Sequence, residues 1–432
     1  MSARRAMNML ETVQALQQTL SQAAKQSLDR RFGALFDKVY RLDVLWQSWR
    51  QVRSKRGGPG IDGETIEYIE EEIGVPVFLQ ELRDQLKAQS YRPQPVKRVW
   101  IEKPGKKEKR PLGIPRIRDR VAQTAVRLVI EPIFETNFLD CSYGFRPCRK
   151  AHEAIDEIQH GITFDGYREV VDADLKSYFD TIPQNKLLEL VGRRISDRRV
   201  LALIKSWLKC GVMEEGKARK VTTGTPQGGC ISPLLSNVYL HGFDKMWQLW
   251  GMKDTKLVRF ADDFVILCRR NGHEALCQAR RFLGRLGLTL NEEKTRVVSA
   301  KRGFDFLGMT FRDRRTSRRA TRLKYCCYNW PRRQAIASLK EKIHSTIGRR
   351  YSLSLQEIIR EINLTLRGWY HYFKVGNSEP HFRRLDRYVL NRLRIFMKRK
   401  HSDPCRGRWR ITDDLVDRLG LFRLARVRVY FV

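Results

Sequence analysis

Two adjacent aspartates, Asp262 and Asp263, are the residues of this sequence whose types and spacing are best suited to chemistry. One apolar run, 257–260, enters them and another, 264–268, leaves them, which predicts two strands joined by a tight turn with the acidic pair at its tip. Neighbouring carboxylates repel each other unless a cation neutralises them. Mg²⁺ fits best, because it takes hard oxygen ligands and shares its coordination shell with phosphates. A solvated acidic hairpin tip is the alternative.

A third carboxylate, Asp174, follows a strand-like stretch at 170–173 and precedes two aromatic residues. Asp174 and Asp262 could together hold two Mg²⁺ ions roughly 4 Å apart, the arrangement that clamps the attacking and leaving oxygens in phosphoryl transfer. The three aspartates therefore predict a site for two-metal chemistry on phosphates.

At this point the sequence resembles a known family. Phe-Ala-Asp-Asp at 260–263 resembles the Tyr-x-Asp-Asp box of reverse transcriptases, and 174–180 resembles their first palm motif. Phe260 keeps the aromatic ring of the usual tyrosine and loses its hydroxyl. The order of these and further blocks, over roughly residues 55 to 400, resembles bacterial group II intron-encoded reverse transcriptase/maturases. The resemblance implies an RNA-directed DNA polymerase in which Asp174, Asp262 and Asp263 are catalytic and bind the two Mg²⁺ ions.

A basic β-hairpin is predicted by the alternation at 96–101 and by a second strand that starts at Arg110. It resembles the fingers hairpin of the family. The resemblance implies that Lys103 and Arg110 hold the triphosphate of the incoming deoxynucleotide, the lysine as a point charge and the arginine as a bidentate fork. A solvated basic hairpin remains the alternative for the other lysines of its turn.

Two further residues are expected to contact the incoming nucleotide. Phe179 matches the family's bulky residue beneath the sugar, which would clash with a 2′-hydroxyl and so select deoxynucleotides; by spacing alone it reads as ordinary core. Gly-Thr-Pro-Gln-Gly at 224–228 resembles the family's Pro-Gln-Gly motif, which implies that Gln227 lies near the nucleotide's sugar.

Contacts with template and primer are expected at three further places. Gly60 and Asp62 belong to a Gly-x-Asp-Gly block that, in the resembled family, lies over the template. Arg146 stands in a Ser-Tyr-Gly-Phe-Arg-Pro block, and the resemblance gives it a contact with the template backbone. Gly308 lies in a block that resembles the primer grip, where a glycine lets the backbone approach the primer end.

Lys294 has two interpretations. It stands in a block that resembles the family's sixth motif, and it could contact the primer–template end or protonate the leaving pyrophosphate. A surface salt bridge with Glu292 or Glu293 is equally compatible with the sequence.

The C-terminal part predicts basic helices. Apolar residues recur at helical spacing over 336–347 and 382–396, the second stripe among many arginines and lysines. Between them, Arg-Gly-Trp at 367–369 resembles the maturase-specific block, whose aromatics could equally be core. We expect four residues to bind RNA: Arg367, Trp369, Arg387 and Arg394.

Composition supports a polyanionic partner. The 432 residues carry 84 Lys and Arg against 48 Asp and Glu, a formal charge of +36, which favours nucleic acid. No apolar run approaches the roughly 18 residues of a membrane span, so we expect no membrane partner and a bacterial cytoplasmic location, in a ribonucleoprotein or near the nucleoid. The nine cysteines form no C-x-x-C pair and are expected to be free thiols, without the Cys-containing HNH endonuclease of many relatives.

The predicted fold is α+β: a right-hand polymerase with an antiparallel sheet, followed by an α-helical thumb. Its expected domains are 1–90 (helical extension and template lid), 91–315 (fingers and palm), 316–400 (thumb/maturase) and 401–432 (a short basic DNA- and RNA-binding tail). The arginines between 312 and 322 are interpreted as a linker between palm and thumb, with helices after it.

The expected partners are the host group II intron RNA, an RNA template paired with a DNA primer, the DNA target and deoxynucleotides; a homodimer is compatible with the sequence. The resemblance also implies roles in splicing and retrohoming. Two alternatives remain: a domesticated reverse transcriptase in DNA repair or phage defence, and an RNA-binding splicing factor without polymerase activity. The intact aspartates argue against the second alternative.

Overall fold

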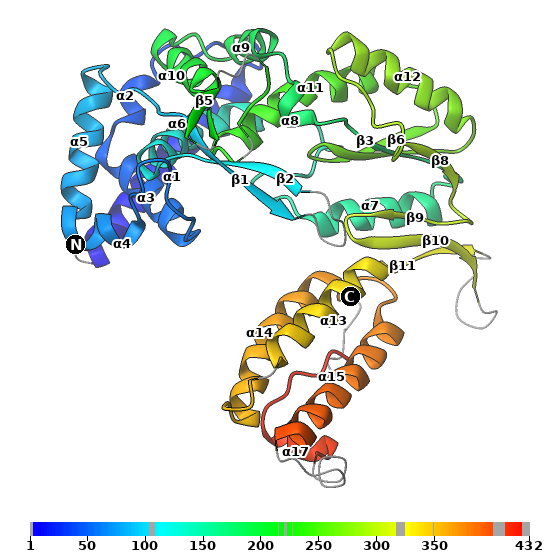
Figure 1. Ribbon diagram of the computed structural model, residues 1–432. Coiled ribbons are helices and arrows are strands. Elements are labelled where there is room, and N and C mark those ends of the chain that lie inside the picture. The colour runs from blue at the N-terminus through cyan, green and yellow to red at the C-terminus, as the bar shows by residue number, and fades with distance from the viewer. Residues whose placement is uncertain are drawn as a thin grey trace. The chain divides into compact units, whose positions relative to one another are not determined.

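The computed structural model describes residues 3–102, 109–214, 216–219, 223–226, 228–316, 325–348, 350–400 and 411–425 (Figure 1). The chain forms two compact units, each assembled from separate stretches. The first unit comprises Met1–Arg149, Ala173–Phe264 and His273–Arg296, and the second comprises Lys150–Asp172, Val265–Gly272 and Val297–Val432. Three sheets accompany the helices, which confirms the predicted α+β class.

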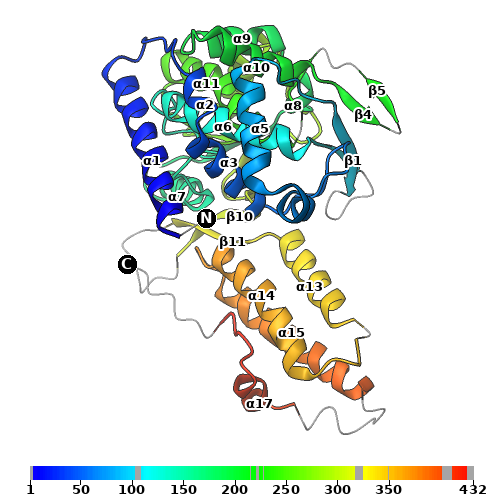
Figure 2. The same cartoon turned by 90° about the vertical axis from the view of Figure 1, so that its left-hand side faces the viewer.

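A helical layer forms the N-terminal part of the first unit. Helix α6 (Ile117–Glu135) is its centre: apolar and polar side chains are buried on all its sides, so it is packed round by other helices. Figures 1 and 2 show α1 and α3 beside it. The other helices of this part are α1 (Ala3–Gln26), α2 (Phe36–Val39), α3 (Leu42–Ser54), α4 (Ile66–Tyr68), the π-helix η1 (Ile69–Ile73) and α5 (Val75–Lys87).

The predicted basic hairpin is confirmed as β1 (Val96–Glu102) and β2 (Lys109–Ile114). The two strands are antiparallel, with Ile101 opposite Arg110. They belong to a four-stranded sheet of order β2-β1-β4-β5, in which β1 pairs in parallel with β4 (Val212–Glu214). Strand β5 (Lys217–Arg219) closes a second hairpin with β4, visible at the edge of the unit in Figure 2.

The sheet that carries the acidic residues has four strands in the order β6-β7-β3-β8. Strands β6 (Thr255–Phe260) and β7 (Asp263–Cys268) form the predicted hairpin with a two-residue turn. The other strands are β3 (Glu169–Asp174) and β8 (Arg296–Ser299). The helices that accompany this sheet in sequence are α7 (Ala151–Thr163), α8 (Tyr178–Thr181), α9 (Gln184–Gly192), α10 (Arg198–Lys209), α11 (Ser232–Trp250) and α12 (Gly272–Arg285).

The second unit contains an antiparallel three-stranded sheet of order β11-β10-β9, built from β9 (Phe304–Phe306), β10 (Met309–Arg315) and β11 (Tyr325–Pro331). This corrects the expectation of a linker followed directly by helices. Buried residues alternate with more exposed ones over 309–314, so Arg312 and Arg314 lie on the solvent face of a strand whose other face buries Met309, Phe311 and Asp313. The expected linker arginines Arg318, Arg319 and Arg322 lie outside the described residues. The first thumb helix begins only at Arg333.

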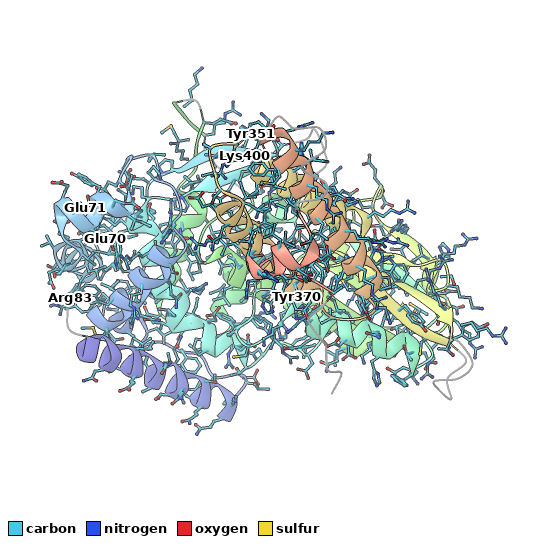
Figure 3. The ribbon with its side chains drawn as sticks, turned by 90° about the horizontal axis from the view of Figure 1, so that it is seen from below. Glu70, Glu71, Arg83, Tyr351, Tyr370 and Lys400 are labelled. Carbon is cyan, nitrogen blue, oxygen red and sulfur yellow. The ribbon has the colours of Figure 1, made fainter. Side chains whose placement is uncertain are left out.

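Helices α13 (Arg333–Ile347), α14 (Leu355–Phe373) and α15 (Glu379–Lys400) lie side by side in Figure 1, and α17 (Asp413–Arg418) follows. Each of the three long helices buries one apolar stripe, as the sequence pattern predicts. Two contacts join the C-terminal end of α15 to the segment between α13 and α14, and Figure 3 labels Tyr351 and Lys400, which take part in them. The Tyr351 ring stacks on Phe396 with ring centres 5.8 Å apart, and the ammonium of Lys400 donates to the Leu353 carbonyl.

Among the helices that the structure describes, none is both long enough and apolar enough to cross a membrane. The cysteines of the described ranges are free thiols, as expected, and Cys405 lies outside them.

Candidate active site

The three predicted aspartates come together in the first unit. Asp174 ends β3, Asp262 lies in the turn between β6 and β7, and Asp263 begins β7. The carboxyl groups of Asp263 and Asp174 are joined by a hydrogen bond, and the charges of all three act on one another. The hydrogen-bonded pair is thus Asp174 with Asp263, with Asp262 beside it.

Lys294 reaches the same cluster. The backbone N–H of Asn291 donates to the Asp174 carbonyl at 2.8 Å, which brings residues 288–294 against the end of β3. The Lys294 ammonium then forms an ion pair with the Asp174 carboxylate. Glu292 pairs instead with Arg280, at 2.6 Å, so the structure replaces the salt bridge suggested by sequence with one to a predicted catalytic residue.

Two carboxyl groups of this cluster, Asp262 and Asp263, have raised pKa values. Burial, followed by the charges of Asp262 and Asp174, raises the pKa of Asp263 to about 7. Burial and the charge of Asp174 also raise the pKa of Asp262. Burial opposes the charge of Lys294, but the hydrogen bond and charge of Asp174 outweigh it and raise the pKa of the lysine. The site therefore favours positive charge, whether protons or a bound cation supply it.

Arg259 anchors the turn that carries Asp262 to a neighbouring helix. It is fully buried in β6 and forms a salt bridge of 2.5 Å with Asp244 of α11, which is fully buried as well. A second guanidinium nitrogen donates to the Ala261 carbonyl at 2.9 Å, directly before Asp262. Burial opposes the charge, but Asp244 keeps the pKa of Arg259 raised. Arg259 therefore fixes the turn to α11, a helix that carries none of the predicted site residues.

Arg259 also anchors the Ser-Tyr-Gly-Phe-Arg-Pro block to the acidic turn. Its guanidinium donates to Ser142 Oγ at 2.7 Å and to the Asn237 side-chain carbonyl at 3.1 Å. The Asn237 amide then donates to the Gly144 carbonyl at 2.8 Å. A Cβ on Gly144 would lie 2.4 Å from the backbone nitrogen of Ala261, so only glycine allows this approach. This network is not predictable from the sequence, because its members are far apart in the chain.

His241, on α11, gives the first testable prediction. Both ring nitrogens are buried without a hydrogen-bond partner among the described residues, and burial lowers the pKa of His241 to about 4. As pH falls from about 6.5 towards 4, the His241 ring therefore binds a proton in the unfolded chain but stays neutral in the folded chain. Wild type should lose up to roughly 2 kcal/mol more stability than His241→Leu between about pH 7.5 and pH 5. Urea unfolding at both pH values measures this; equal losses would contradict it.

The nucleotide-side residues are partly described. Arg110 is exposed on β2, whereas Lys103 and Gln227 lie outside the described residues. Phe179 is half-buried on α8 beside Tyr178, with ring centres 5.5 Å apart, and its carbonyl accepts from the Thr225 N–H at 2.7 Å. Thr225, directly before the Pro-Gln-Gly motif, thus lies beside the predicted sugar-contacting residue.

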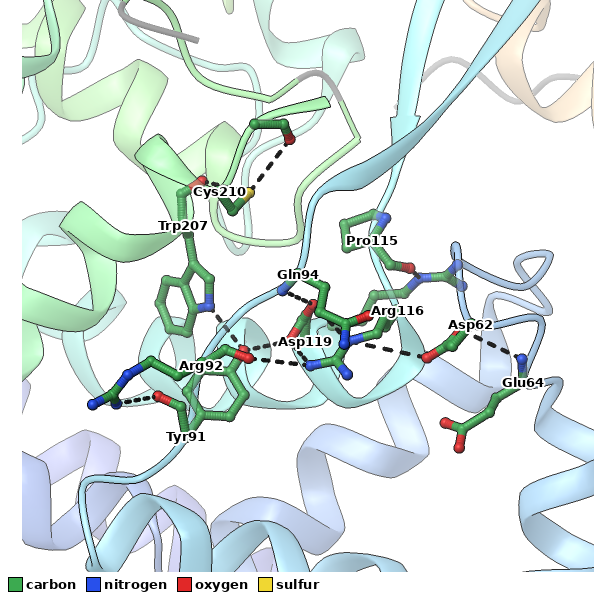
Figure 4. Close-up of polar contacts among 12 residues, drawn as sticks. Asp62, Glu64, Tyr91, Arg92, Gln94, Pro115, Arg116, Asp119, Trp207 and Cys210 are labelled. Carbon is green, nitrogen blue, oxygen red and sulfur yellow. Dashed lines mark hydrogen bonds and ion pairs between the residues drawn. The ribbon is translucent and has the colours of Figure 1, made fainter. Parts of the chain in front are cut away.

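The predicted template-lid residues are anchored to the start of α6. A Cβ on Gly60 would lie 2.7 Å from the Cα of Arg116, and Asp62 forms an ion pair of 4.0 Å with the same arginine. Figure 4 shows how Arg116 is held in turn by Asp119, which also accepts a hydrogen bond of 2.6 Å from the Tyr91 hydroxyl. Gly60 and Asp62 therefore have a structural reason for their identities, besides the expected role at the template.

Several other predicted residues have internal partners. Arg146 is nearly buried and pairs with Glu135 at 2.6 Å, so its guanidinium points into the protein here. Gly308 has φ 76°, a conformation that favours glycine, in the turn between β9 and β10. Their contacts with template and primer stay predictions.

Three of the four predicted RNA-binding residues of the thumb also contact other residues of the protein. The half-buried Trp369 ring packs on Phe373, with ring centres 4.5 Å apart, against the helical core. Arg367 lies over the Phe422 ring at 5.0 Å, and Arg394 donates to the Ile411 carbonyl at 3.2 Å. Arg387 is exposed on α15. RNA binding by these residues stays a prediction.

The chemistry of the acidic cluster fits magnesium. Among the described residues, no group of three or more His, Cys, Asp or Glu side chains is placed so that it could hold a metal ion. Mg²⁺ does not need such a group, since it commonly takes one or two carboxylates and completes its shell with water and substrate phosphates. A hydrogen-bonded carboxyl pair with a third carboxylate alongside offers those oxygens.

Comparison with known proteins identifies the class first. A reverse transcriptase (RNA-dependent DNA polymerase) family model matches residues 101–311, and a group II intron maturase-specific domain model matches residues 336–413. The chain therefore carries a polymerase domain of the class that copies RNA into DNA, followed by a maturase-specific domain. Reverse transcriptases as a family use divalent metal ions.

Two relatives extend over most of the chain. Protein YkfC of Escherichia coli (strain K12) is 35% identical over 337 residues, which are 68% of this chain and 87% of YkfC. Group II intron-encoded protein LtrA of Lactococcus lactis subsp. cremoris is 30% identical over 375 residues, 71% of this chain and 61% of LtrA, so this chain spans less than two thirds of that relative. The chain belongs to the group II intron-encoded reverse transcriptase/maturase family.

Among solved structures, a Cas6-RT-Cas1–Cas2 complex is similar over 58% of this chain at 22% identity; its TM-score of 0.36 is too low to indicate a shared function.

Proposed function

We propose that this chain extends a primer 3′-hydroxyl on an RNA template with deoxynucleotides, and that Asp174, Asp262 and Asp263 are the catalytic residues. The observation that carries the proposal is the meeting of these three carboxylates with Lys294 at the adjoining ends of β3 and β7. The raised pKa values of Asp262 and Asp263 are the expected mark of a site in which a cation completes the charge balance.

Each residue has a part in this reaction. The three carboxylates would hold two Mg²⁺ ions, which supply activation of the 3′-hydroxyl and neutralisation of the triphosphate. Lys294, paired with Asp174, keeps a proton at the site and can give it to the leaving pyrophosphate. Arg110, with Lys103 and Gln227, would orient the nucleotide from the fingers side. Arg259 positions the turn and touches no reacting atom.

Phe179→Ala should relax the choice of sugar, which is the second prediction. Without the ring, a 2′-hydroxyl meets no obstacle, and we expect discrimination against ribonucleotides to fall by roughly 10- to 100-fold. The measurement is kcat/KM for one deoxynucleotide and its ribonucleotide in single-nucleotide extension. Phe164→Ala, which removes a ring that is 63% exposed, is the control. Unchanged discrimination would mean that Phe179 is only core.

Intron RNA, the RNA template with its DNA primer, target DNA and deoxynucleotides are the proposed partners. The maturase-specific match and the charge of +36 support binding of the host intron RNA, stabilisation of its folded form in splicing, and reverse transcription at a DNA target during retrohoming. We place this activity in the bacterial cytoplasm, within a ribonucleoprotein close to the nucleoid.

The test of the proposed function is primer extension by the full chain on an RNA template with Mg²⁺. Deoxynucleotide-dependent cDNA, lost on chelation of Mg²⁺, is the expected result. If a folded chain that binds RNA makes no cDNA, the polymerase proposal is wrong and the RNA-binding splicing factor is favoured.

A further inference from the structure

A large groove lies wholly within the second unit, on the solvent face of the β9–β10–β11 sheet. Its volume is about 1410 Å³. The walls come from the three strands, from the first turn of α13, from residues 374–378 with the first turn of α15, and from residues 424–425. Pockets for one drug-sized ligand measure roughly 300–1,000 Å³, so this groove has room for more than one nucleotide-sized group.

The groove is basic. Its two carboxylates already have partners: Asp305 accepts a hydrogen bond of 2.6 Å from the Thr310 hydroxyl, and Glu379 pairs with Arg383. The cationic side chains outnumber them, and a concave surface of one sign attracts a polyanion. The cationic lining residues are Arg312, Arg314, Arg332, Arg333, Lys374 and Arg384.

Two aromatic rings lie on the floor of the groove. Tyr328 and Trp330 are two residues apart on β11 and therefore point to the same face of the sheet, opposite Arg312 and Thr310 of β10. Both rings are half-buried, and the guanidinium of Arg314 lies over the Trp330 ring at 4.7 Å. A sheet face with aromatic rings and arginines is a surface on which unpaired bases stack.

The start of α13 adds hydrogen-bond donors to the same wall. Arg332 is the N-cap residue, no side chain caps the helix, and no acidic residue stands in its first turn. Such a helix start attracts anionic groups such as phosphate. The Nε of Arg332 is buried and has no hydrogen-bond partner among the described residues. An acceptor from outside the chain would satisfy a donor that the fold leaves unused.

We propose that this groove binds a short segment of single-stranded RNA, with bases stacked on Trp330 and Tyr328 and phosphates held by the arginines and the start of α13. A duplex does not suit it, because paired bases do not expose their faces for stacking. The proposal rests on the proposed function only in naming RNA as the partner. The groove is separate in sequence from the catalytic aspartates and would hold RNA that is not being copied.

The experiment measures binding of a short fluorescent oligouridine RNA to the full chain with an unlabelled primer–template duplex present in excess. Trp330→Ala should bind the RNA about tenfold more weakly than wild type, the effect of removing one stacked ring. Trp250→Ala, which removes a tryptophan that is 59% exposed in the first unit, should bind as wild type does. Both variants should keep wild-type primer extension. Arg314→Gln tests the same face with an exposed residue if Trp330→Ala does not fold.

The outcomes separate this proposal from the polymerase proposal. If folded Trp330→Ala binds the RNA as tightly as wild type does, the proposal that the groove binds RNA is wrong. The same holds for Arg314→Gln where that variant takes the place of Trp330→Ala. An equal loss of affinity for the oligodeoxyuridine of the same length would overturn the choice of RNA as its ligand. A wild-type chain that extends no primer would count against the polymerase alone, since the dependence of RNA binding on Trp330 is measured without catalysis.

Discussion

Asp262→Ala should abolish primer extension while leaving the chain folded. Removing one carboxylate from the proposed two-metal site takes away several kcal/mol of transition-state stabilisation, so we expect a loss of at least about 10³-fold in kcat. The stability of the folded chain should not fall, because burial and the charge of Asp174 raise the pKa of Asp262. A raised carboxyl pKa means that the ionised group destabilises the fold at neutral pH. In the absence of metal, Asp262→Ala should therefore unfold at the same temperature as wild type or higher.

Asp140→Ala is the matched control, since it removes a carboxylate whose side chain is 93% exposed. It should extend primers at the wild-type rate. Both variants and wild type are compared in single-turnover extension with saturating Mg²⁺ and by thermal unfolding in chelator. Extension by Asp262→Ala within about tenfold of wild type would move the catalytic centre away from this turn. A large fall in its unfolding temperature would mean instead that Asp262 serves structure.

The acidic hairpin was predictable because every feature that defines it is local. Apolar strands on both sides of Asp262 and Asp263 specify the hairpin, and strand pairing then aligns β7 with β3, which ends in Asp174. Arg259 stands in the same stretch, yet its role was not predicted. Its partners, Ser142 and Asp244, come from other blocks, and only the fold brings them together. A charged residue inside an otherwise apolar strand was the available signal, together with Asn237 and Asp244 at helical spacing.

The stretch after Gly308 shows how composition can hide a pattern. Its arginines suggested a linker, but the residues between them are apolar or buried, and the alternation has the period of a strand. Arg146 and Trp369 show the opposite limit. Their motifs matched the family, but a motif does not tell whether a side chain points to a ligand or into the protein. In this structure Arg146 forms an ion pair with Glu135, and the Trp369 ring packs on Phe373.

Arg259→Met should be among the most damaging single substitutions in this chain. It leaves the fully buried Asp244 carboxylate without its partner, and breaking a buried ion pair from one side costs about 3–5 kcal/mol. Replacing both members, Arg259→Met with Asp244→Leu, removes the unpaired charge and should recover most of that loss. Urea unfolding of the two single variants and the double variant measures the coupling. The exposed pair Arg280 and Glu292, replaced in the same way, should change stability by less than about 1 kcal/mol.

The double variant also separates positioning from stability. It folds without the hydrogen bonds from Arg259 to Ala261, Asn237 and Ser142, so the turn that carries Asp262 is no longer held to its neighbours. Small displacements of catalytic groups cost up to about 10²-fold in rate, and we expect kcat to fall by roughly 10- to 100-fold with little change in the KM for deoxynucleotide. If the stable double variant keeps the wild-type kcat, Arg259 contributes to folding alone. If kcat falls while the exposed-pair control stays at the wild-type rate, the buried arginine sets the geometry of the acidic turn.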